Sequence, residues 1–217
     1  MPAPQQIPRP TGWRRAPELA WRGDLSLPAL LDQPPVVPTG SFADASGVVV
    51  APPATRLSAV LVALTDALPE RRGTHVLVTR RSAHLRNHAG EVSFPGGRVE
   101  AGEDPVGAAL RESSEEVALD PADVKVHGEL PHVHTLVSGS YIVPVVAEVP
   151  EPRLLVPNPF EVDAAYWVPL DVLTTRGVHH RELWTRDGRT APIEFFELVD
   201  DTIWGATARM LVTLLSA

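Results

Sequence analysis

Residues Gly96 to Leu119 read GGRVEAGEDPVGAALRESSEEVAL, and this stretch decides the fold. Within it, Asp104 and Pro105 predict the start of a helix, because aspartate is a good N-cap and proline is tolerated at the first helical position. The helix is expected to run to about Val117. One of its faces is apolar and can anchor it to a sheet through Val106, Leu110 and Val117.

Three glutamates share the other face of this predicted helix. Glu112, Glu115 and Glu116 stand at positions i, i+3 and i+4. Like charges so placed repel one another, and the negative end of the helix dipole adds to the repulsion. A divalent cation would reverse the sign of these effects, and carboxylate oxygens are the hard ligands that Mg2+ or Mn2+ prefer. A solvated acidic face without a metal is the alternative.

The residues around the glutamates favour the metal. Gly96 and Gly97 predict a tight turn, where a backbone group can approach a metal or a phosphate closely. Glu103 supplies another carboxylate just before the helix. Arg111 can pair with a nearby carboxylate and hold it in place.

Taken together, these residues resemble the Nudix box. That motif is a glycine, five residues, Glu, seven residues, Arg-Glu, an aliphatic residue, any residue, Glu-Glu, any residue, glycine and an aliphatic residue. Ser113 replaces the first aliphatic residue, and its hydroxyl can bond back to the Ala109 carbonyl. Ala118 replaces the glycine at the helix end, at a cost of about 1 kcal/mol if that position is left-handed. The matching residues are Gly97, Glu103, Arg111, Glu112, Glu115, Glu116 and Leu119.

The resemblance implies a Nudix fold, an α/β architecture in which a mixed β-sheet lies between helical layers. It also implies a metal-dependent pyrophosphohydrolase that uses Mg2+ or Mn2+. The implied metal ligands are Glu112, Glu115, Glu116 and the backbone of Gly96. The implied catalytic residues are Arg111, Glu115, Glu116 and a further loop carboxylate, Glu161, with Asp163 as the alternative.

A second resemblance lies upstream, in LVTRRSAHLRNHAGEVSFPGG from Leu77 to Gly97. It is similar to the additional signature of the coenzyme A pyrophosphatase branch, and so implies coenzyme A as substrate. Arg81 and Arg86 would then bind phosphates beside Gly97, because guanidinium groups match phosphate geometry. Two alternatives stay open. One is another nucleotide substrate, such as ADP-ribose, a dinucleotide or an oxidised nucleotide. The other is a non-catalytic nucleotide-binding module.

The remaining pattern predicts mostly strands. Strands with two helices, mostly not alternating, favour a mixed sheet between helical layers. Pro144 suggests an edge strand or a bulge, and Thr202 is expected to cap a last helix that ends at Leu215. Asp187-Gly188 predicts a hairpin turn. The expected strands are Ser58 to Leu64, His75 to Thr79, Lys125 to Leu136, Tyr141 to Val149, Tyr166 to Val168, Glu182 to Thr185 and Ile193 to Leu198.

Residues 1–55 are interpreted as a proline-rich arm and residues 56–217 as the Nudix domain. Eleven of the 23 prolines lie between Pro2 and Pro53. One short helix is expected near Leu25 to Leu31, and Trp13 and Trp21 are expected to pin part of the arm onto the domain. Removal of residues 1–40 is expected to leave a folded, active domain.

Composition and charge limit the classes of protein and partner that remain. The chain has 217 residues, 44% of them hydrophobic, which suits one soluble domain. A net charge of −8 argues against nucleic acid as a partner. No apolar run approaches the roughly 18 residues that span a bilayer, and the start lacks a secretory signal, so we expect no membrane and a cytoplasmic location. The expected partner is a small molecule; the oligomeric state stays open, with a homodimer as one alternative.

Overall fold

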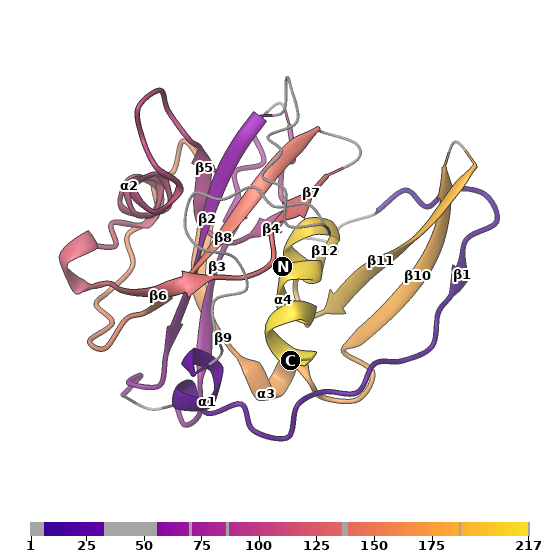
Figure 1. Cartoon of the computed structure of the whole chain (residues 1–217), viewed down its shortest axis with the longest axis horizontal. Helices are drawn as coiled ribbons and strands as arrows, with labels where there is room; N and C mark the ends of the chain where they lie inside the picture. The colour runs from indigo at the N-terminus through magenta and orange to yellow at the C-terminus, as the bar shows by residue number, and fades with distance from the viewer. Residues whose placement is uncertain are drawn as a thin grey trace, which may run out of the picture.

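The computed structural model describes residues 7–32, 56–69, 71–85, 87–135, 139–186 and 188–216. Its main element is an eight-stranded mixed sheet (Figure 1). Two of its strands, β2 (Arg56–Thr65) and β8 (Ser140–Glu148), run parallel, and β3 (His75–Arg81) is antiparallel to β2. The other strands are β4 (Val92–Ser93), β5 (Gly96–Arg98), β6 (Lys125–Glu129), β7 (Val133–His134) and β9 (Val162–Pro169).

Both faces of this sheet are buried. Along β2, Leu61 and Ala63 pack into one apolar cluster, and Val62 and Leu64 pack into another. Strand residues alternate between the two faces of a sheet, so a strand with six consecutive apolar residues, Ala59 to Leu64, must be covered on both sides. The mixed sheet between two layers, expected from the sequence, is therefore confirmed.

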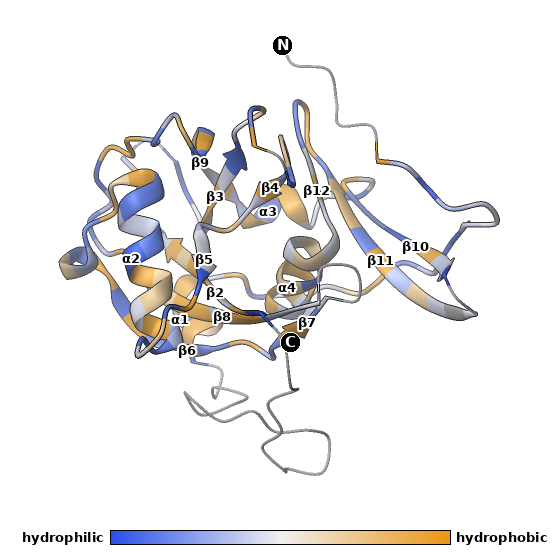
Figure 2. Ribbon diagram, turned by 90° about the horizontal axis from the view of Figure 1, so that it is seen from above, coloured by the Kyte–Doolittle hydropathy of each residue, from blue (hydrophilic) through white to orange (hydrophobic). Residues whose placement is uncertain are grey.

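One covering layer is helix α2 (Pro105–Val117), which begins at the expected residue. The Asp104 side chain accepts a hydrogen bond from the Gly107 N–H at 2.7 Å and caps the helix. The helix carries both hydrophobic and hydrophilic residues (Figure 2), and Val117 is fully buried against the sheet. Helix α2 thereby presents its C-terminal glutamates beside β5. A short 3-10 helix, η1 (Pro121–Asp123), follows.

The layer on the other face contains a second sheet, which the sequence did not predict as a separate unit. Its hairpin pairs β10 (His179–Arg186) with β11 (Arg189–Glu197), and β12 (Thr202–Trp204) extends it. Helix α4 (Gly205–Ser216) follows directly and buries Met210, Leu211, Leu214 and Leu215. Helix α3 (Leu170–Leu173) precedes the hairpin. No helix in the described parts of the chain is long and apolar enough to cross a membrane.

Three local expectations were wrong. Thr202 does not cap α4 but lies in β12, where its hydroxyl donates to Glu197 at 2.7 Å. The strand expected from Lys125 is interrupted between β6 and β7.

Pro144 lies inside β8, which has neighbours on both sides, so the edge position is wrong. The other alternative, a bulge, is found in the ladder between β6 and β8, where the register shifts between Val126 and Gly128. Proline is tolerated at position 144 because it faces the interruption between β6 and β7, where no N–H is needed from it. Its carbonyl accepts a hydrogen bond from the Leu130 N–H at 2.9 Å.

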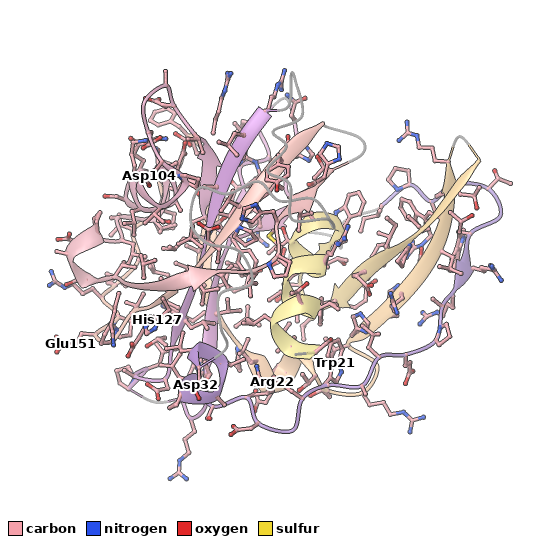
Figure 3. The ribbon with its side chains drawn as sticks, in the orientation of Figure 1. Trp21, Arg22, Asp32, Asp104, His127 and Glu151 are labelled. Carbon is pink, nitrogen blue, oxygen red and sulfur yellow. The ribbon has the colours of Figure 1, made fainter. Side chains whose placement is uncertain are left out.

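The N-terminal segment packs more closely than its prolines suggest. Helix α1 (Leu27–Leu31) buries Leu27 and Leu30 in the main core. Trp21 packs against the same core and lies near α4 (Figure 3). Strand β1 (Arg14–Arg15) pairs with β10, and the Arg9 guanidinium lies 2.8 Å from the buried Glu182 carboxylate. Most prolines of the arm lie outside the described residues.

Candidate metal and phosphate site

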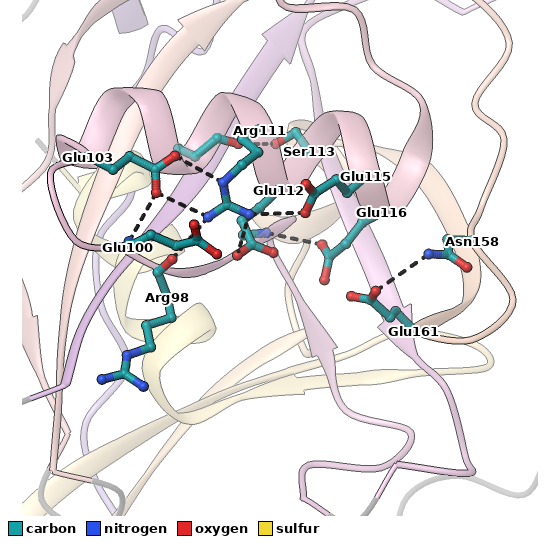
Figure 4. Close-up of polar contacts among 12 residues, drawn as sticks. Arg98, Glu100, Glu103, Arg111, Glu112, Ser113, Glu115, Glu116, Asn158 and Glu161 are labelled. Atoms are coloured by element: carbon teal, nitrogen blue, oxygen red, sulfur yellow. Dashed lines mark hydrogen bonds and ion pairs between the residues drawn. The ribbon is translucent and has the colours of Figure 1, made fainter.

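Three carboxylates converge at the C-terminal end of α2 (Figure 4). Glu112 and Glu116 are one helical turn apart, and Glu161 reaches them from the loop before β9. One oxygen from each residue lies within 4.8 Å of the others. In the described part of the chain, these three side chains lie close enough together to hold a metal ion.

Glu116 lies at the centre of the group and is 3% exposed. Its carboxylate accepts a hydrogen bond from the Gly96 N–H at 3.1 Å, and the Arg81 guanidinium lies 3.8 Å away. Burial raises the pKa of Glu116 to about 7, against the lowering effect of these two donors. Burial also raises the pKa of Glu112. The cluster therefore resists holding its full negative charge without a cation.

Two glycines let the backbone of β5 approach α2. A Cβ atom added to Gly97 would lie 2.4 Å from the Glu112 carboxylate carbon. A Cβ atom at Gly96 would lie 2.3 Å from the Ala59 carbonyl oxygen, and Gly96 has a φ of +152°. Neither position accommodates a larger residue without moving β5 or Glu112. Gly96 and Gly97 therefore lie directly against the carboxylate cluster, as expected. The tight turn predicted at these residues is wrong, because both belong to strand β5 and pair with β2.

Arg111 holds the acidic residues on the outer side of the cluster. Its guanidinium donates to Glu103 at 2.9 Å and to Glu115 at 3.0 Å, and lies 3.1 Å from Glu112. It also donates to the Arg98 carbonyl at 3.1 Å. Hydrogen bonding to Glu103 raises the pKa of Arg111, so the residue stays charged. Arg111 therefore orients Glu112 toward the cluster while offsetting part of its charge.

The loop before β9 has two anchors beside the cluster. The Glu161 carbonyl accepts a hydrogen bond from the Ser82 N–H at 2.8 Å. Asp163, the alternative to Glu161 in the sequence, instead accepts from the Ala83 N–H at 3.0 Å. Asp163 therefore fixes the start of the loop after β3, whereas Glu161 joins the carboxylates.

The structure does not gather every residue that the sequence singled out. The Glu115 side chain is 55% exposed and pairs with Arg111 outside the group, so its role as a ligand stays a prediction. Arg86 lies outside the described residues. Asn158, which contacts both Glu116 and Glu161, was missed, because the Asn-Pro pair signals only a turn.

The residues present fit a divalent cation. Glu112, Glu116 and Glu161 supply hard oxygen ligands, and burial raises the pKa of Glu112 and Glu116, an effect that a bound cation would oppose. The backbone of Gly96 and Gly97 lies directly against the cluster, and Arg81 supplies a guanidinium beside it.

The chain is similar to known proteins. A family model described as the NUDIX domain matches residues 55–188. The uncharacterized Nudix hydrolase NudL of Escherichia fergusonii is 36% identical over 159 residues, which cover 72% of this chain and 79% of that protein. A NudL protein of Photorhabdus laumondii is 38% identical over 139 residues, covering 63% and 73%. In fold, a MutT/nudix family protein from Enterococcus faecalis aligns with a TM-score of 0.52 and 17% identity, covering 78% of this chain and 64% of that one.

Proposed function

Because this chain belongs to the Nudix hydrolase family, whose members act on phosphoric anhydrides, we propose that its substrate is coenzyme A or a coenzyme A derivative. Cleavage of the pyrophosphate would give 3',5'-ADP and 4'-phosphopantetheine. The cytoplasm is the location that we propose with this substrate. The family assignment makes the chain a metal-dependent pyrophosphohydrolase, and the choice of coenzyme A rests on the stretch from Leu77 to Gly97.

One observation supports that choice. Arg81, in the upstream stretch, lies 3.8 Å from Glu116 in the carboxylate cluster. The same stretch ends in Gly96 and Gly97 of β5, which lie against Glu116 and Glu112. The residues that resemble the coenzyme A signature therefore border the group that would hold the metal, where a substrate pyrophosphate must lie.

The chain's own residues have distinct proposed roles. Glu112, Glu116 and Glu161 would hold Mg2+ or Mn2+, with Glu115 and the Gly96 backbone as further candidate ligands. A bound divalent cation neutralises charge that develops on phosphate oxygens and lowers the pKa of a coordinated water. Arg111 orients Glu112, as its 3.1 Å contact indicates.

Further roles concern the substrate and the proton. Arg81 and Arg86 would bind the phosphates, and the backbone of Gly97 is a further candidate contact. Glu161 is the proposed base, because it projects from a loop outside the helix and faces the other two carboxylates. Glu116 is the alternative base, because it belongs to the same carboxylate group.

A substrate panel tests the proposal. With Mg2+ and with Mn2+, coenzyme A should show a higher kcat/KM than ADP-ribose, NADH or deoxynucleoside triphosphates, with products resolved by chromatography. Arg81→Ala should lower kcat/KM for coenzyme A about tenfold or more, because a charge-assisted contact to phosphate is lost. Arg72→Ala removes an exposed arginine from the β2–β3 turn and should leave the value unchanged.

The panel also separates the alternatives. Equal or better turnover of another nucleotide would replace coenzyme A and leave the family assignment intact. Binding of nucleotides without turnover of any of them would favour the non-catalytic module.

A further inference from the structure

The loop that carries Glu161 is attached to α2 through Asn158. The Asn158 N–H donates to the Glu116 carbonyl at 2.8 Å, and the Val156 N–H donates to the Val117 carbonyl at 3.0 Å. Both carbonyls belong to the last turn of α2, where intrahelical partners are missing. The loop therefore meets the helix at the residue whose side chain lies at the centre of the carboxylate cluster.

The rest of Asn158 fixes the backbone around Glu161. Its side-chain Oδ1 accepts from the Phe160 N–H at 3.2 Å, which closes a turn of the kind that asparagine favours. Its carbonyl accepts from the Glu161 N–H at 3.0 Å and from the Val162 N–H at 2.8 Å. These bonds set the point from which the Glu161 side chain projects.

The Asn158 amide also faces the Glu161 carboxylate. Nδ2 lies 3.5 Å from Glu161 Oε1 (Figure 4). The neighbouring carboxylates of Glu112 and Glu116 repel Glu161 when no cation is bound. A neutral N–H donor restrains one oxygen of Glu161 without adding a charge to the group.

From these contacts we propose that Asn158 is a positioning residue, which holds Glu161 against Glu112 and Glu116 and acts on catalysis through Glu161. This inference rests on the proposed function, because it assigns Glu161 a role in metal binding or proton transfer. It goes beyond that function by naming the residue that couples the outside carboxylate to the helix.

A double-mutant cycle tests the coupling. Asn158→Ala is made in the wild-type chain and in the Glu161→Gln chain. In the wild-type chain it should lower kcat for coenzyme A about tenfold and weaken Mn2+ binding by a similar factor, as the loss of groups that orient metal ligands typically does. KM should change little. In the Glu161→Gln chain the same substitution should change both quantities less than about twofold.

Leu154→Ala is the matched control. Leu154 belongs to the same loop but is 88% exposed, so its removal should change neither Mn2+ affinity nor turnover. If Asn158→Ala does not fold, Asn158→Asp replaces it in the same cycle. Aspartate keeps the acceptor for the Phe160 N–H but places a charge next to Glu161, and its effect should disappear in the Glu161→Gln chain.

The proposal is overturned if Asn158→Ala changes neither kcat nor Mn2+ affinity in the wild-type background, or if it lowers them equally in both backgrounds. Mn2+ affinity, measured by calorimetry, does not depend on the substrate. If coenzyme A is not hydrolysed, the cycle in Mn2+ affinity still decides the role of Asn158. If Glu161→Gln leaves both Mn2+ affinity and turnover intact, this role is refuted while the hydrolase assignment stands.

Discussion

At the scale of single residues, Glu116 links stability to pH. Its pKa in the folded protein is about 7, above the ordinary 4.5, so without metal its protonated form stabilises the fold below pH 4.5. That contribution is lost as the pH rises through 7. Glu116→Gln mimics the protonated form, and metal-free Glu116→Gln should be more stable than wild type above pH 7, by about 1 to 3 kcal/mol, with the difference vanishing near pH 4.5.

Chemical denaturation across this pH range would measure the effect. Glu151→Gln is the matched control, because it removes the same charge from an exposed loop residue outside the cluster. A constant difference between wild type and Glu116→Gln at all pH values would contradict the argument. Turnover of Glu116→Gln should fall about a hundredfold or more, because the stabilisation that a metal gives is worth several kcal/mol.

The site could be predicted from the sequence only where helix geometry controls it. Glu112 and Glu116 are four residues apart, so their side chains point almost the same way. The Glu115 side chain points in a different direction around the helix, and its hydrogen bond from Arg111 holds it away from the other carboxylates. Spacing cannot show which loop completes the cluster, so Glu161 was named by resemblance alone.

At the scale of elements, the N-terminal segment should contribute to stability. The sequence suggested that removal of residues 1–40 leaves a folded domain, but the structure buries Leu27 and Leu30 and pairs β1 with β10. Losing a buried leucine side chain typically costs about 2 to 5 kcal/mol. We therefore expect the truncated protein to melt at least about 5 °C lower or to unfold.

A matched pair of point variants isolates the cause. Leu30→Ala should lose about 2 to 5 kcal/mol of stability, whereas the exposed Leu154→Ala should lose less than about 0.5 kcal/mol. Truncation without a change in melting temperature would mean that α1 contributes no net stability to the fold.

Local signals explain which elements were foreseen. Helix α2 was found because Asp104 and Pro105 mark its start, and Ala118 takes the left-handed conformation that ends it, with φ of 58°. The packing of α1 was not predicted, because a high proline content argues against regular secondary structure but does not show which apolar residues of the segment are buried. Thr202 was taken for a cap because a threonine before an apolar helix resembles one, although Gly205 begins α4.

At the scale of the whole molecule, metal binding should stabilise both sheets together. Phe196 and Ile203 of the second sheet share a core with Val62 of the first. A ligand that binds only the native state at a hundred times its Kd adds about 2.7 kcal/mol. Mg2+ should therefore raise the melting temperature by roughly 5 to 10 °C in one transition, followed by both circular dichroism and tryptophan fluorescence.

Glu116→Gln should reduce this Mg2+-dependent shift, because it removes a hard ligand from the native state only. A shift of the same size in wild type and variant would place the stabilising ion elsewhere. Two separate transitions would show that the sheets unfold independently in spite of their common core.

The origin of the carboxylates in distant parts of the chain has a consequence for biosynthesis. Glu112 and Glu116 leave the ribosome together on α2, but Glu161 and Asn158 follow only after β6, β7 and β8 have been made. A nascent chain that ends at β8 therefore has two of the three carboxylates and lacks the loop that carries the third. Such a chain should capture cations weakly, and hydrolytic competence should arise late during translation, once β9 has joined β3.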